Sequence, residues 1–78
     1  MDLIKLHKIK EFALEQMDKW GIDDWKFVWD TRAVRRYGQC RYRRKEIGIT
    51  KVLANLNTIE ETKDVVLHEI AHALVGPG

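Results

Sequence analysis

A chain of 78 residues, 45% of them hydrophobic and 33% charged, has the composition of one small globular domain, which excludes a disordered chain and several domains. The formal net charge of +2 at pH 7 is too small to indicate a class of partner by itself. No apolar run approaches the roughly 20 residues that cross a bilayer, and the N-terminus lacks the basic and apolar segments of a signal peptide. We therefore expect a single cytoplasmic domain over residues 1–78 that does not contact a membrane.

The N-terminal segment predicts a helix from about Leu3 to Lys19. Asp2 is placed to cap its start, and Gly21 is placed to end it in a left-handed conformation. Apolar side chains recur at spacings of three and four residues, which puts them on one face of this helix: Leu6, Ile9, Phe12, Ala13, Met17 and Trp20.

From Trp25 to about Thr50 the apolar period changes to two, which is typical of half-buried strands. The alternating residues are Trp25, Phe27 and Trp29, then Cys40 and Tyr42, then Ile47 and Ile49. This pattern predicts a small antiparallel sheet, with residues 30–32 closing a first hairpin and residues 43–46 a second. Gly38 within the second strand indicates a bulge or a close approach by another backbone.

The C-terminal segment predicts a helix over residues 59–75, which contain neither glycine nor proline. Thr58 followed by Glu61 forms a capping box at its start, and Gly76 and Pro77 end it.

This last predicted helix contains the run His68-Glu69-Ile70-Ala71-His72. Residues four apart lie on the same helix face, so the His68 and His72 imidazoles can bind one metal ion. Glu69 lies about 100° around the helix from His68, where it can reach a metal-bound water without being a ligand. Since zinc lowers the pKa of bound water toward about 7 and polarises carbonyls, the run predicts zinc-dependent peptide hydrolysis with Glu69 as the base. A chance pair on a solvated face is the alternative, and the glutamate between the histidines argues against it.

A third zinc ligand is not evident. Catalytic zinc uses three protein ligands plus water, and none of the six residues after His72 is His, Asp, Glu or Cys. The remaining candidates are Asp64, His7 and Cys40. Each also has a simpler interpretation. Asp64 fits a carboxylate exposed to solvent, and His7 fits a boundary position of the first helix. Cys40 fits a small buried residue on a strand. Cys40 is also the only cysteine, which excludes an internal disulfide and a four-thiolate site and fits a reducing compartment.

Two runs of this sequence resemble the SprT-like family of zinc metallopeptidases, which includes proteases that digest proteins crosslinked to DNA. The first is GQCRYRRKEIGIT (residues 38–50), similar to the family's Gly-x-Cys strand and the Ile-x-Leu/Ile-Ser/Thr strand after it, and the second is LHEIAHAL (residues 67–74). The resemblance implies an α+β, minimal zincin-like domain with an N-terminal helix, a small antiparallel sheet and a C-terminal HExxH helix. It also implies that His68 and His72 bind zinc and that Glu69 is the catalytic base.

The resemblance further implies a third histidine a short distance beyond the active-site helix, and the sequence stops at Gly78, where that segment would begin. We therefore expect the domain to be incomplete at its C-terminus. Either the 78 residues are part of a longer protein, or the protein is naturally short and its zinc site is incomplete, shared with a partner, or lost.

Basic residues concentrate between positions 32 and 45, a stretch without an acid: Arg32, Arg35, Arg36, Arg41, Arg43, Arg44 and Lys45. Interleaved with tyrosines, they fit a surface that follows phosphates and stacks on bases, and a solvated strand face that protects a sheet edge is the alternative. The candidate nucleic-acid contacts are Arg35, Arg36, Arg41, Arg43 and Arg44.

The sequence therefore predicts a zinc metallopeptidase whose protein or peptide substrate lies along the edge strand, with DNA-associated proteins as one class of target. Two other hypotheses stay open. The first is a non-catalytic module that binds nucleic acid or a partner on a metalloprotease scaffold. The second is a fragment whose folding needs a missing C-terminal segment, and a concentration-dependent dimer that covers exposed apolar surface would indicate it.

Overall fold

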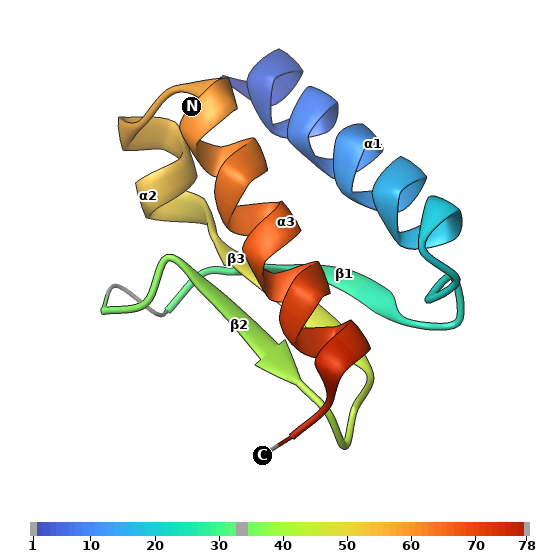
Figure 1. The fold of residues 1–78 in the computed structure, drawn as a ribbon. Coiled ribbons are helices and arrows are strands. Elements are labelled where there is room, and N and C mark those ends of the chain that lie inside the picture. Colours follow the sequence, from blue (N-terminus) through green and yellow to red (C-terminus); the bar gives the residue numbers. More distant parts are fainter. Residues whose placement is uncertain (1, 33–34, 78) are drawn as a thin grey trace.

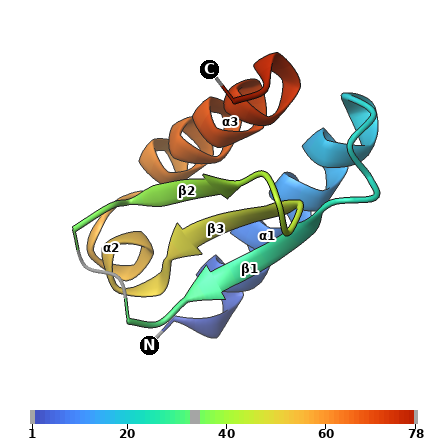
Figure 2. The same cartoon turned by 90° about the horizontal axis from the view of Figure 1, so that it is seen from below.

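The computed structural model describes residues 2–32 and 35–77. The elements follow in the order α1 (Leu3–Lys19), β1 (Lys26–Asp30), β2 (Gly38–Arg41), β3 (Glu46–Thr50), α2 (Lys51–Leu56) and α3 (Ile59–Val75). Helices α1 and α3 pack against each other over one face of a three-stranded sheet (Figure 1). Seen from below, α3 lies along the β2 side of the sheet, and α1 passes behind β3 and β1 (Figure 2). The predicted α+β class, with a helix at each end of the sequence, is confirmed.

Helix α1 has the predicted bounds, and both predicted caps are present. The Asp2 carboxylate accepts a hydrogen bond from the Lys5 backbone N–H at 3.1 Å, and Gly21 has a φ of 78°. Most of the predicted apolar face is buried: Leu6, Ile9, Ala13 and Met17. Phe12 is partly buried, and Trp20 is 51% exposed. Its backbone has left the helical conformation at the C-cap, so its side chain no longer follows the helical period.

The sheet is mixed, and the prediction of an antiparallel sheet is wrong. Strand β3 lies in the centre, parallel to β1 and antiparallel to β2, with Ile47 paired to both Phe27 and Cys40. Because β1 and β2 are not neighbours, residues 30–32 do not close a hairpin. The predicted second turn is confirmed to within a residue, since β3 begins at Glu46 and Lys45 before it has a φ of 54°. An alternating apolar pattern is the same in parallel and antiparallel strands, so it carries no information about strand direction.

The core forms where the central strand meets the two long helices. Ile47 and Ile49 of β3 are fully buried, as are Val66 of α3 and Ile9 of α1. Fully burying a side chain of this size contributes about 1.5–3 kcal/mol. This packing fixes α3 over the sheet and presents one of its faces to β2.

Helix α3 also has its predicted bounds, and Thr58 caps it as predicted. The Thr58 hydroxyl accepts a hydrogen bond from the Glu61 backbone N–H at 3.1 Å and donates one to the Glu61 carboxylate at 3.0 Å, so Glu61 contacts the hydroxyl of the cap. The helix ends where Gly76 takes a φ of 90°. The six-residue helix α2 was not predicted, because it is too short to show a helical period. No helix within residues 2–32 and 35–77 is long and apolar enough to cross a membrane.

Candidate metal centre

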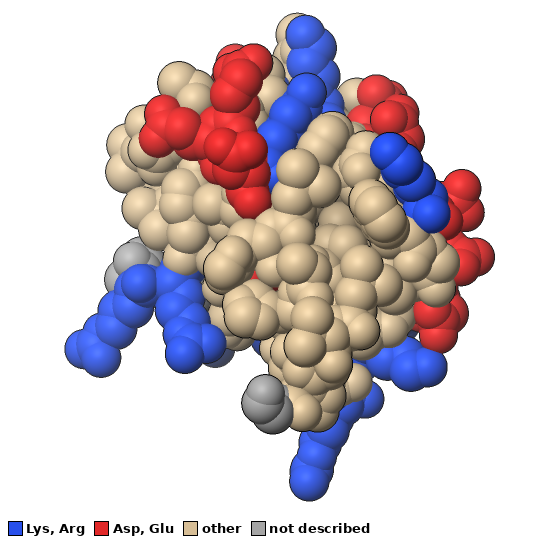
Figure 3. All heavy atoms as spheres, in the orientation of Figure 1, with Lys and Arg blue, Asp and Glu red and all other residues tan. Residues whose placement is uncertain are grey.

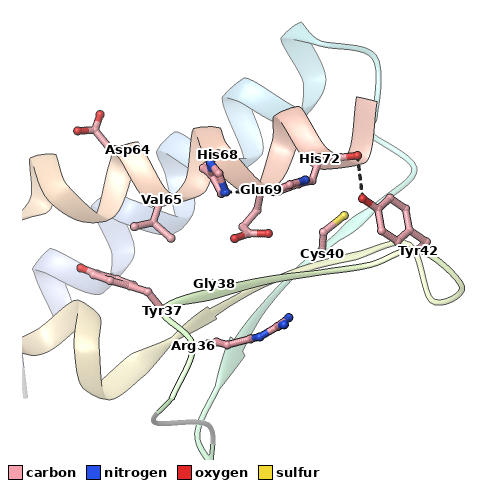
Figure 4. A pocket seen from close by; sticks show the side chains of 10 residues that line it. All are labelled: Arg36, Tyr37, Gly38, Cys40, Tyr42, Asp64, Val65, His68, Glu69 and His72. Atoms are coloured by element: carbon pink, nitrogen blue, oxygen red, sulfur yellow. Dashed lines mark hydrogen bonds between the residues drawn. The ribbon is translucent and has the colours of Figure 1, made fainter. Parts of the chain in front are cut away.

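Helix α3 presents His68 and His72 side by side on the face that looks toward β2 (Figure 4). Their Nε2 atoms lie 3.0 Å apart, and their rings are nearly perpendicular, at 85° with centroids 4.5 Å apart. Both side chains are exposed. Two nitrogens bound to a tetrahedral zinc ion are about 3.3 Å apart, given Zn–N distances of about 2.0–2.1 Å. The two imidazoles therefore converge as two ligands of one ion would.

Glu69 lies between the histidines in sequence but points to a different place. Its side chain extends from α3 toward β2, at the floor below the two imidazoles (Figure 4), and the residue is only 8% exposed. Gly38 of β2 lies directly beneath it, close enough that a Cβ atom there would be 2.9 Å from Glu69 Cγ. The sequence suggested a bulge or a close approach by another backbone at Gly38, but the strand keeps a continuous register with β3 and the three nearest atoms belong to side chains of α3.

An open cleft of about 630 Å³ separates β2 from this face of α3. Its walls come from the segment before and along β2 and from one side of α3: Arg36, Tyr37, Gly38, Cys40, Tyr42, Asp64, Val65, His68, Glu69 and His72. Strand β2 is an edge strand, paired only with β3 among the described residues. The histidine pair and the buried carboxylate thus share one cleft with an edge strand.

The structure separates the three candidates for a further metal ligand. Asp64 and Cys40 both line the cleft, whereas His7 lies on α1 and pairs with Glu11 at 3.1 Å. Across residues 2–32 and 35–77, however, no three His, Cys, Asp or Glu side chains gather closely enough to hold a metal ion. The described residues therefore bring two histidines together, without a third side chain that could complete a metal site.

Two weakly acidic groups of the cleft are neutral at pH 7. Burial raises the pKa of the Cys40 thiol, and the nearby Glu69 carboxylate acts in the same direction, whereas a hydrogen bond with Tyr42 opposes them. The pKa of Tyr42 is raised by loss of solvent and then by Cys40 and Glu69.

The Tyr42 hydroxyl donates a hydrogen bond to the His72 backbone oxygen at 3.0 Å. This bond ties the β2–β3 turn to the last turn of α3.

The five candidate nucleic-acid contacts do not form one surface. Arg41 is engaged on the sheet, where its guanidinium lies 2.7 Å from Asp30 and 3.6 Å from Glu46. The other four are exposed and fall into two pairs, Arg35 with Arg36 before β2 and Arg43 with Arg44 after it. Basic side chains gather toward both ends of β2, at the lower left and lower right of Figure 3, with uncharged surface between them.

Sequence reasoning did not place Tyr37 and Val65 in the cleft. The Tyr37 hydroxyl is within hydrogen-bond distance of Thr62 on α3, a residue 25 positions away in sequence. No local pattern links these positions, because only the packing of α3 on β2 brings them together. The one available signal was Gly38, whose place inside a strand indicated a close approach.

The family model of the SprT-like family matches residues 6–76. This range includes nearly all of α1, the whole sheet and α3 with its two histidines. No curated protein and no solved structure matches the chain.

Proposed function

The chain belongs to the SprT-like family, and from this premise we propose that it is a zinc-dependent metallopeptidase with Glu69 as its general base. One observation carries the proposal: the Nε2 atoms of His68 and His72 converge to 3.0 Å beside a buried carboxylate in an open cleft. A catalytic metal site of this kind needs two ligands one helical turn apart on a helix and a general base next to them.

The fit of the described residues to zinc is partial. His68 and His72 would hold the ion through Nε2, whereas the described residues offer no third ligand. Bound zinc supplies a water of lowered pKa and polarises the carbonyl of the peptide bond. Neutral imidazole suits this role, and the exposure of both rings leaves the site open to solvent and substrate.

Glu69 would accept a proton from the attacking water and deliver it to the departing amine nitrogen. Its position at the cleft floor suits this task, because burial keeps the carboxylate in one place while one side still faces the cleft. Within the described residues Glu69 forms no ion pair, so its charge is not neutralised by a neighbouring cation.

The substrate would be an extended protein segment. Edge strand β2 runs along the cleft, and an edge strand can bind a peptide through backbone hydrogen bonds. The exposed arginine pairs at its two ends, Arg35 with Arg36 and Arg43 with Arg44, would contact phosphates, so that proteins bound to DNA are the targets we favour.

A second candidate function is a non-catalytic module that binds nucleic acid or a partner protein. The observation in its favour is that the described residues bring together only two metal ligands. It predicts nucleic-acid binding that depends on salt and is indifferent to a chelator.

The test is peptide hydrolysis by the zinc-loaded protein and by its Glu69→Gln variant, which preserves the size of the side chain. Hydrolysis should fall about 10²–10⁴-fold, the usual contribution of a general base, while zinc affinity stays unchanged. Glu60→Gln, an exposed acid on the same helix, is the matched control. Full activity in Glu69→Gln would exclude this base. Nucleic-acid binding without hydrolysis by the zinc-loaded wild type would favour the second function.

A further inference from the structure

The contact between Gly38 and Glu69 explains why a glycine occupies this position in β2. A Cβ atom at Gly38 would lie 2.9 Å from Glu69 Cγ, 3.0 Å from Glu69 Oε2 and 2.9 Å from Val65 Cγ1. Gly21 and Gly76 take positive φ values, but Gly38 does not. The backbone conformation at Gly38 therefore does not require glycine. What the position requires is space, because α3 places two side chains where a Cβ atom would be.

We propose that Gly38 is a positioning residue for Glu69. Its missing side chain leaves the space at the cleft floor in which the carboxylate is held, below the His68 and His72 imidazoles. The catalytic consequence rests on the proposed function, in which Glu69 is the general base. The contact itself stands on the geometry alone.

The size of the expected displacement follows from ordinary contact distances. Carbon atoms without a bond between them pack best at about 3.5–4.0 Å, and the Gly38 Cβ would meet Glu69 Cγ at 2.9 Å. To restore that distance, the glutamate side chain must move away from β2 by about 0.6–1.1 Å. A general base has to lie within about 2.6–3.2 Å of the proton that it takes, and a misplacement of about 1 Å can lower the rate about 100-fold.

Gly48 of the neighbouring strand β3 provides a matched control. A Cβ atom there would be 2.4 Å from Asp30 Oδ2 and 2.6 Å from Arg41 Nη1, which belong to the ion pair away from the cleft. Gly38→Ala and Gly48→Ala thus both crowd a strand of the same sheet. Only Gly38→Ala crowds Glu69.

The first experiment measures kcat, KM and zinc affinity of both variants, well below their melting temperatures. Gly38→Ala should lower kcat about 100-fold and leave zinc affinity unchanged, because the three atoms nearest the new methyl group belong to Glu69 and Val65 and to neither histidine. Gly48→Ala should lower the melting temperature and leave kcat near that of the wild type. Equal losses of kcat in the two variants would overturn the proposal, since a general weakening of the sheet would then explain both.

The second experiment does not depend on activity. The loss in melting temperature caused by Gly38→Ala is measured in the wild type, in Glu69→Ala and in Val65→Ala. The loss should shrink to about half or less in Glu69→Ala, because contacting residues are energetically coupled. Relief in Val65→Ala alone would overturn the proposal and assign Gly38 to packing. If the coupling to Glu69 is present but the zinc-loaded wild type hydrolyses nothing, the placement of Glu69 by Gly38 is supported and the proposed function fails.

Discussion

The two faces of strand β2 differ in whether the carboxylates beside them are paired with a cation. On the face toward α3, Gly38 makes room for Glu69, and no cation within the described residues pairs with that carboxylate. Away from the cleft, Arg41 pairs with Asp30 at 2.7 Å and with Glu46 at 3.6 Å. The first and last residues of β2 therefore have different roles. The ion pair links β2 to β1 and β3, whereas the Glu69 carboxylate has no ion-pair partner among the described residues, which suits the general base that we propose.

The largest effect on stability should come from breaking the ion pair of Arg41. Arg41→Ala leaves Asp30 without its hydrogen-bond donor, and the other carboxylate oxygen of Asp30 is already buried without a partner. We expect a loss of about 2 kcal/mol in the free energy of unfolding, or roughly 10 °C in melting temperature for a domain of this size. Arg43→Ala, at an exposed position two residues later, should change the free energy of unfolding by less than about 0.5 kcal/mol. Equal melting temperatures for the two variants would show that the ion pair of Arg41 does not stabilise the fold.

The contrast between the paired Arg41 and the exposed Arg43 and Arg44 also predicts how nucleic-acid binding depends on salt. The double variant Arg43→Ala with Arg44→Ala should reduce the slope of log K against log salt by about 1.4 for single-stranded DNA, because two phosphate contacts are lost. Arg41→Ala should leave the slope unchanged, since its guanidinium is already engaged. The measurement is a salt titration of binding to a fluorescent oligonucleotide. A slope that changes with Arg41 as much as with the Arg43 and Arg44 pair would contradict this assignment.

A smaller effect is expected at Cys40, on the cleft side of β2. Because burial raises the pKa of its thiol, less of it is thiolate in the folded than in the unfolded chain at the same pH. Thiolate is the reactive form, so alkylation by iodoacetamide at pH 8 should be slower than in urea. A raised folded pKa stabilises the protein below the ordinary thiol value of 9.0, and this contribution is lost as the pH rises through the folded pKa. Equal alkylation rates with and without urea would show that the thiol is not shielded.

The elements defined by local signals were predicted correctly from the sequence. Asp2 and Gly21 bound α1, and Thr58 and Gly76 bound α3, because caps act on the residues next to them. The convergence of His68 and His72 is local in the same sense, since one helical turn separates them. It was therefore predictable as a motif, and the structure adds the distance.

Features that depend on contacts between distant segments were not predicted. The parallel pairing of β1 with β3 cannot be read from an alternating pattern, which led to the wrong antiparallel sheet. The engagement of Arg41 follows from that pairing, because β3 lies between β1, which carries Asp30, and β2, and only the folded sheet brings the two charges together. The space that Gly38 leaves for Glu69 likewise exists only once α3 has packed over β2.

Zinc binding tests the central claim most directly. Zinc affinity and stoichiometry should be measured by calorimetry for the wild type and for His68→Ala, His72→Ala and His7→Ala. We predict that zinc binds to the wild type and that either cleft histidine variant weakens binding by more than about 100-fold, beyond the usual loss for a residue that only supports a ligand. His7→Ala should bind as the wild type does, because this histidine lies on α1, away from the cleft. Zinc binding that survives loss of both cleft histidines, or that depends on His7, would contradict the account.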